Sequence, residues 1–366
     1  CGNYTMGNGA GIGHLGRSMN VTIANNSVLF NQSFNQGLGV SGGGIYIGGQ
    51  ASLVPTRLSP GAGFVTVSAN LIQGNQAGAG DGGGIRAEFV NGLDIWRTPN
   101  NPILWYQLTM VNNMVVDNIA GMAGGGISLQ DTVRANVSNN TIANNDSTAT
   151  AGAAFSANSP NQSTRQPAGI VSRAHSTLLY NTIGIGPNAL PYKKEYSNPT
   201  LTNNIVWHNR SFYWAIDNST DPSTFGLVPN IGAGQPAVYA DMAVLGAAGS
   251  LDPRYSILTD ATGYAASNFS ADPLFVLEYV NGDQGQTIQQ PELTTSIATA
   301  PAFDEGGNFI DVRFGPLTPT GDYHINAGSP ARGAGGVAVG VNVDFDGAAR
   351  PAPTGTPLDI GADERN

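Results

Sequence analysis

Alternating oxygen-bearing residues near the end of the chain give its clearest candidate for metal chemistry. Residues 342–347 read Asn-Val-Asp-Phe-Asp-Gly, and a calcium-binding loop begins in this way, with ligand oxygens at every second position and a glycine for the turn. The bidentate glutamate expected at the twelfth position of such a loop is missing, since Pro353 stands there. The pattern predicts a structural calcium ion held by Asn342, Asp344 and Asp346. The alternative is that these acids cap turns and pair with Arg350 or Arg332.

Aromatic side chains form two groups that could bind a sugar. Exposed tryptophan and tyrosine rings on the flank of a fold stack on sugar rings or pack against a neighbouring chain. The candidate ligand-binding residues are Trp96, Trp105, Tyr106, Trp207, Tyr213 and Trp214. The alternative is that these rings pack loops onto the fold, and the sequence leaves both interpretations open.

Residues for bond-breaking chemistry do not form a recognisable set in the sequence. Hydrolysis of a polysaccharide needs two carboxylates facing a groove, whereas the acids of residues 9–186 stand far apart in sequence. No zinc-type spacing links the histidines, which are His14, His175, His208 and His324. No Ser-His-Asp order and no phosphate-binding glycine loop is present. We therefore predict a protein that is not an enzyme, with no catalytic residues and no cofactor beyond a structural calcium ion.

The elements that would hold these residues repeat along the chain. Three glycines followed by isoleucine recur at 42–45, 82–85 and 124–127, and weaker copies stand at 9–12 and 151–154. Asn-rich segments of alternating apolar and polar residues accompany these blocks. A fixed period of about 20–50 residues indicates a solenoid, in which each repeat packs only against its neighbours.

Glycine and asparagine are assigned structural roles in these repeats. Glycine permits positive φ angles and close approach of successive backbones. Asparagine tolerates left-handed backbone at turns, and stacked asparagine side chains can hydrogen-bond along a ladder. Alternating Val, Ile, Leu and Phe would fill a narrow interior. The fold predicted from these patterns is an all-β solenoid built from thin strands.

Three regions of this solenoid are predicted. Coils occupy 1–216 and carry loop insertions at 51–61 and 91–102, where prolines break the alternation. An irregular surface excursion follows over 217–251, and late coils with an irregular closing region form 252–366. One further turn of the coil is expected from the segments 168–171 and 176–183.

Composition limits the partners. The chain of 366 residues has a net charge of −10, which argues against nucleic acid and anionic membrane surfaces. No apolar run approaches the length of a membrane span. Cys1 is the only cysteine, so no internal disulfide forms. Cys1 followed by glycine is also typical of the lipid-carrying end of a bacterial lipoprotein, and the alternative is a cut within a longer protein.

The last hundred residues carry five ordered blocks, which read ADPLF (271–275), GDYHI (321–325), SPARGAG (329–335), VDFDG with RP (343–351) and DIGADE (359–364). Together with the Gly/Asn repeats, these blocks resemble the bacterial choice-of-anchor Q type surface proteins. The resemblance covers essentially the whole chain and implies a right-handed parallel β-helix that is secreted or displayed at the cell surface. The block SPARGAG departs from the family's SPAIDAG by losing its Asp, and no sorting tail follows Asn366.

These observations predict a secreted or cell-surface structural or adhesive protein. A first coil without a capping element would expose unpaired backbone groups, and such edges recruit another chain. We therefore expect head-to-tail self-association into extracellular filaments, with surface glycans as the other expected partner. The alternative is a carbohydrate-binding or polysaccharide-degrading β-helix protein that uses its aromatic flank. A third interpretation makes the chain part of a larger surface protein whose function lies elsewhere.

Overall fold

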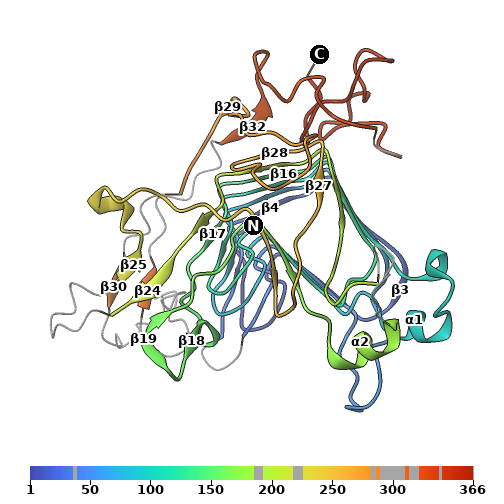
Figure 1. Cartoon of the computed structure of the whole chain (residues 1–366), viewed down its shortest axis with the longest axis vertical. Helices are drawn as coiled ribbons and strands as arrows, with labels where there is room; N and C mark the ends of the chain where they lie inside the picture. Colours follow the sequence, from blue (N-terminus) through green and yellow to red (C-terminus); the bar gives the residue numbers. More distant parts are fainter. Residues whose placement is uncertain are drawn as a thin grey trace.

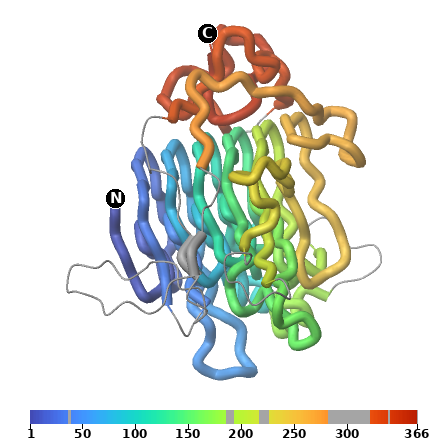
Figure 2. The backbone as a smooth tube through the Cα atoms, turned by 90° about the vertical axis from the view of Figure 1, so that its left-hand side faces the viewer, coloured from blue at the N-terminus to red at the C-terminus, as the bar shows by residue number. Residues whose placement is uncertain are grey.

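The chain winds into a parallel β-helix, which confirms the predicted solenoid (Figure 1). The computed structural model describes residues 1–35, 39–184, 193–216, 226–281, 321–337 and 340–365, together with the backbone of β30 (Gln286–Ile288) and β31 (Ile310–Val312). Four parallel sheets run along the molecule, and each contains six strands, one from every coil. Figure 2 shows the coils side by side, with the N-terminus at one end of the stack.

The four sheets take their strands in coil order, and their bounds are as follows. Sheet A contains β1 (Tyr4–Thr5), β5 (Gln32–Ser33), β9 (Gln76–Ala77), β13 (Ile119–Ala120), β17 (Asp146–Ser147) and β23 (Arg210–Ser211). Sheet B contains β2 (Ile12–Leu15), β6 (Ile45–Gly48), β10 (Ile85–Glu88), β14 (Ile127–Gln130), β20 (Ile170–Arg173) and β26 (Met242–Leu245). Sheet C contains β3 (Ser18–Ala24), β7 (Gly63–Ser68), β11 (Leu108–Val111), β15 (Ala135–Ser138), β21 (Thr200–Thr202) and β27 (Pro253–Arg254). Sheet D contains β4 (Ser27–Leu29), β8 (Leu71–Gln73), β12 (Met114–Val116), β16 (Thr141–Ala143), β22 (Ile205–Trp207) and β28 (Ile257–Leu258).

The isoleucine of each glycine block sets the register of sheet B. Ile45 pairs with Ile12 on one side and with Ile85 on the other, and Ile127 continues the row. These side chains belong to one continuous hydrophobic core that runs along the coils. Because successive coils place isoleucine, or Met242 in the last coil, at the same point, apolar side chains stack into the narrow interior.

The glycine triplet is required where the chain passes between sheets A and B. Gly42 has a φ of +71°, a conformation that side chains with a Cβ rarely adopt. A Cβ atom on Gly43 would lie 2.2 Å from the carbonyl oxygen of Gln76 in the next coil. The first glycine therefore makes the turn, and the second lets two backbones touch.

Two asparagine ladders run along the coils, as the repeats predicted. In both, the side-chain Nδ2 of one coil donates to the Oδ1 of the next at 2.8–3.2 Å. One ladder contains Asn26, Asn70, Asn113, Asn140 and Asn204. The other contains Asn3, Asn31, Asn75, Asn118, Asn145 and Asn209. The ladders satisfy polar groups that the coil turns would otherwise bury unpaired.

Two predicted coil segments have other structures. The copy expected at 151–154 forms the 3-10 helix η2 (Gly152–Ala154), and β20 supplies the coil strand instead. The segment expected to continue the coil at 176–183 forms the helix α2 (Thr177–Ile183), because Leu179 and Ile183, four residues apart, are buried on one face.

Insertions leave the coils on two sides. An antiparallel sheet follows η2 and contains β18 (Phe155–Ser156), β19 (Ser159–Ser163), β24 (Tyr213–Ala215) and β25 (Gly226–Val228). The insertion expected at 91–102 contains the helix α1 (Leu93–Arg97) and the 3-10 helix η1 (Pro102–Leu104), and α1 contacts α2. The insertion expected at 51–61 is a loop without strands.

The interval 217–251 is only partly an excursion. Its residues 217–225 lie outside the described part, and it contains β25 and the 3-10 helix η4 (Ile231–Ala233). Its last part contains β26, which pairs in parallel with β20 and so belongs to the final coil. The regular strand pairing identifies this stretch as solenoid although its sequence is irregular.

A C-terminal cap, defined as described residues 272–281, 321–337 and 340–365, covers the outer face of sheet D (Figures 1 and 2). Its strands β29 (Phe275–Leu277) and β32 (Asp322–Ile325) pair in antiparallel fashion. Tyr323 and Ile325 pack on outward-facing apolar side chains of sheet D such as Met114 and Ile205. The cap lies within the residues predicted to form the closing region, and it covers a side wall of the coil.

Candidate functional site

Three of the six predicted sugar-binding rings are buried. Trp105 is fully enclosed by a small apolar cluster that includes Leu179 and Ile183, and its Nε1 donates to the carbonyl of Thr98 at 2.8 Å. Trp207 is buried under the C-terminal cap, and Trp214, on β24 of the antiparallel insertion sheet, is buried with Phe212 and Leu227. These three rings pack insertions and the cap onto the coil, and no face of them is open to a sugar.

The other three rings differ in exposure. Trp96 at the end of α1 is 64% exposed, and Ile103 and Leu104 of η1, in the same insertion, are exposed as well. Tyr106 is half-buried and meets Phe64 edge to face at 5.6 Å. Tyr213 is half-buried beneath the guanidinium of Arg165, 4.9 Å from its ring centroid. Among the predicted residues, Trp96 is thus the ring with a free face.

The predicted calcium ligands do not form an open loop. The buried Asp344 accepts backbone hydrogen bonds from Asp346 and Ala348 at its Oδ1, and from Glu364 at its Oδ2. The side chain of Asn342 is exposed, and its carbonyl accepts from the Arg350 amide at 3.0 Å. Asp344 therefore caps the turn, as one half of the alternative interpretation expected, whereas Arg350 forms its ion pair with Glu364. The calcium ion stays a prediction.

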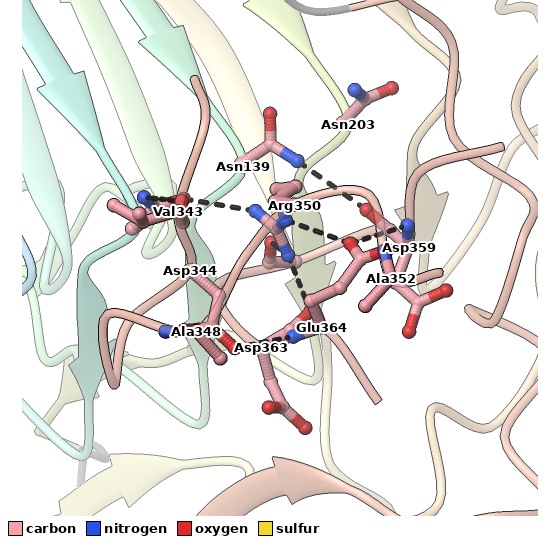
Figure 3. A network of polar contacts seen from close by, with 12 residues as sticks. Asn139, Asn203, Val343, Asp344, Ala348, Arg350, Ala352, Asp359, Asp363 and Glu364 are labelled. Atoms are coloured by element: carbon pink, nitrogen blue, oxygen red, sulfur yellow. Dashed lines mark hydrogen bonds and ion pairs between the residues drawn. The ribbon is translucent and has the colours of Figure 1, made fainter. Parts of the chain in front are cut away.

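Arg350 holds this part of the cap together (Figure 3). Its Nε lies 2.9 Å from Glu364 Oε2, and its Nη1 donates to Asn112 on the solenoid at 2.9 Å. Its Nη2 donates to the carbonyl groups of Gly361 and Asp363. The arginine is buried and fully partnered in this way, so it anchors the cap and is not available to a ligand.

His324 and Asp363 join Asp346 in a group that the sequence did not reveal. One ligand atom from each residue lies within 4.8 Å of the other two, in the only such group among the described residues. The alternation along β32 places Asp322 and His324 on one face, and that signal was visible in the sequence. The approach of Asp346 and Asp363 to His324 depends on the fold of the cap, so it was not visible in the sequence.

The first coil presents an edge that no described strand pairs with. β1, β2, β3 and β4 are each the terminal strand of their sheet. Half of the backbone N–H and C=O groups of such a strand point away from its partner and are free to pair with another strand. The side-chain Oδ1 atoms of Asn3 and Asn26 stand at the same edge, as the starting rungs of the two ladders.

Apolar side chains gather along this edge. Leu15 at the end of β2 and Met19 at the start of β3 are 66% and 74% exposed, and Tyr4 and Met6 are also exposed. Ile12 and Val21, which pack on the end of the core, are only half-buried. We call β1–β4 with these side chains the open edge. It combines free backbone groups with apolar surface.

The opposite end of the stack is partly closed. Ala261 and Tyr264 pack against the core, and Phe269 forms a parallel bridge with Ile257 of β28. The edge strand β27 contains Pro253, which has no N–H to offer to another strand. One ladder ends on the Asp241 carboxylate, which accepts from Asn209 at 3.0 Å and has no amide donor of its own. The two ends therefore differ in their capacity to pair.

Comparisons with known proteins give no family for this chain. Scans against protein-family models, curated proteins and solved structures found no match. The choice-of-anchor resemblance therefore stays a prediction. Within the described residues, no helix has the length and apolar character needed to cross a membrane.

Proposed function

We propose that this protein is a secreted or cell-surface structural protein, a rigid β-helix that presents loop insertions and associates with a second copy through its open edge. The observation that carries this proposal is the open edge itself, where unpaired strands meet exposed Leu15 and Met19. Edge strands of soluble proteins are usually blunted by charge, proline or a covering segment. The opposite end has such features, whereas the described strands β1–β4 contain no proline and no Lys, Arg, Asp or Glu, and the exposed Arg17 lies between β2 and β3.

The difference between the two ends bears on the geometry of association. A head-to-tail contact, as expected from the sequence, would need two complementary ends and would grow into a filament. Because Pro253 and the segment with Tyr264 obstruct the far end, we propose that two open edges meet. Two-fold symmetry would place the two β3 strands antiparallel and would close the assembly as a dimer.

Light scattering after size-exclusion chromatography tests this proposal over a range of protein concentrations. The chain is expected to elute as a dimer, and the variant Leu15→Lys/Met19→Lys as a monomer, because edge lysines oppose strand pairing. Leu53→Lys/Ile103→Lys is the matched control, since both residues are exposed in the insertions. A chain that is monomeric at every concentration, or an edge variant that associates like the parent, contradicts the proposal. Filaments in electron micrographs would favour the head-to-tail contact.

A second candidate function is carbohydrate binding, and the exposed Trp96 favours it. The exposed face of this ring is suited to stacking on a sugar, and the same insertion carries the exposed Ile103 and Leu104. A glycan array probed with the parent chain and with Trp96→Ala tests it, with Leu53→Ala as the control. Binding that Trp96→Ala alone abolishes would support this function, and an array without bound glycans would remove it.

A further inference from the structure

A group of three ligand atoms joins separate parts of the C-terminal cap. His324 lies on β32, Asp346 in the turn held by Asp344, and Asp363 further along the same segment, within residues 359–365. A ring nitrogen and two carboxylate oxygens from these residues lie within 4.8 Å of one another. Histidine with two carboxylates is a ligand set found for divalent transition metals, and calcium in contrast takes oxygen ligands.

Asp322 orients the imidazole of His324. Its Oδ1 lies 2.5 Å from the ring Nδ1 and also accepts the His324 backbone amide at 3.1 Å. A histidine whose Nδ1–H is held by a carboxylate has the lone pair of Nε2 free for a metal. Metal-binding histidines in proteins are commonly held in this way by a carboxylate. The Asp322 carboxylate thus places the His324 ring in this orientation before any metal binds.

The contact between His324 and Asp346 has the geometry of two neighbouring ligands. Nε2 lies 3.0 Å from Asp346 Oδ2, yet this buried nitrogen makes no hydrogen bond within the described part of the chain. The oxygen is therefore close to the nitrogen but lies off the direction in which a ring N–H would point. Two ligand atoms bound to one ion at about 2.0–2.2 Å would stand about 3 Å apart in the same way.

Asp363 supplies a buried carboxylate to this group. The residue is only 6% exposed, and its Oδ2 accepts a hydrogen bond from the Ile325 amide at 3.0 Å. A bound cation would offset the negative charge that the carboxylates of Asp346 and Asp363 bring together beside the His324 imidazole.

We propose that His324 Nε2 and the carboxylates of Asp346 and Asp363 bind one divalent transition-metal ion, with zinc the preferred ion and water completing its coordination. The ion would connect β32, the 342–350 turn and residues 359–365 to one another. The site shares only Asp346 with the calcium loop that the sequence predicted.

Titration calorimetry of the chain with zinc chloride, after treatment with EDTA and dialysis, tests this site. We expect one saturable site per chain and a higher melting temperature with zinc present. Asp346→Asn is expected to abolish the site, and its fold should survive because this side chain is 58% exposed. Asp252→Asn is the matched control, since Asp252 is an exposed carboxylate that is 63% exposed and lies outside the cap.

A second variant keeps the test decisive. His324→Gln retains a polar side chain and should lose zinc binding while its far-UV circular dichroism stays that of the parent. Cobalt(II) provides a spectroscopic signature, since visible absorption of the bound ion should appear in the parent and in Asp252→Asn and be absent in both ligand variants. Absence of a saturable site, or zinc binding that survives in Asp346→Asn or His324→Gln, would show that the group is only an ion pair.

Discussion

The Tyr323 hydroxyl donates a hydrogen bond to Asp117 Oδ2 at 2.9 Å and so links residues that are 206 positions apart. Asn144 on the neighbouring coil donates to the same hydroxyl at 3.2 Å. The ring of Tyr323 also meets that of Phe275 edge to face at 5.0 Å. One tyrosine of the cap is thereby fixed to two coils, and we expect cap and coils to unfold together.

The carboxyl group of Asp117 makes stability depend on pH. Burial raises the pKa of Asp117 well above its usual value, and the nearby acids Asp146 and Glu278 raise it further, against the opposing effects of Tyr323 and Arg210. The folded state therefore holds this proton more tightly than the unfolded state. Its contribution to stability is lost as pH rises from the ordinary carboxyl pKa through the raised one.

The substitution Asp117→Asn should remove the loss of stability that occurs when the pH rises. Asparagine suits the φ of +57° at position 117, as Asn144 shows with +55° at the equivalent place in the next coil. We expect the variant to melt at a higher temperature than the parent at neutral pH and at a similar temperature below about pH 4. Thermal unfolding followed at several pH values measures the difference. A variant that is less stable at pH 7 would show that the charged carboxylate stabilises the fold.

The inner rungs of the asparagine ladders should matter more than the outer ones. Asn118 donates to Asn145 Oδ1 and to the carbonyl of Ile72, and it accepts from both the backbone and the side chain of Asn75. Asn118→Ala leaves these buried groups unpaired, so we expect a loss of at least about 2 kcal/mol in the free energy of unfolding. Urea unfolding measures it, with Asn26→Ala at the exposed end as the control. Equal losses in the two variants would contradict the ladder account.

The middle glycine of a triplet should not accept a methyl group. A Cβ on Gly83 would lie 2.3 Å from the carbonyl oxygen of Ile119, whereas a Cβ on Gly152 would meet nothing within 4 Å. We expect Gly83→Ala to lower the free energy of unfolding by about 1–3 kcal/mol or more, as overpacking does. Gly152→Ala should change it little. Similar unfolding curves for both variants would contradict this prediction, because they would show that the coils separate to accept the methyl group without a loss in the free energy of unfolding.

The stacked coils could be predicted because every coil makes the same close backbone contact and the same turn with the same residue types. Gly43 and its counterparts must pass close to the next backbone, and the asparagines must meet at the same turn, so both patterns are visible in sequence. The copy expected at 151–154 was wrong because small residues there begin an insertion. The turn of the coil expected to include 176–183 was wrong for that segment because short apolar runs are compatible with coil strands and with helices alike.

The candidate sites were harder to predict because they depend on contacts between distant segments. Trp105 is enclosed by side chains of the helices α1 and α2, and no local pattern shows whether such a ring is covered. His324, Asp346 and Asp363 come together through the cap, and only the spacing of Asp322 and His324 is local. Leu15 and Met19 read as ordinary strand residues until the fold places them at an edge.

Hydrogen exchange along β3 (Ser18–Ala24) at low and high protein concentration tests the open edge most directly. Within the described part of the chain, no strand pairs with the amides of β3 that point away from β7, so these amides should exchange fast in dilute solution. Our account predicts that these amides become protected as concentration rises, while amides of the central strand β11 (Leu108–Val111) do not change. Fast exchange of the outward β3 amides at every concentration would contradict association through the open edge.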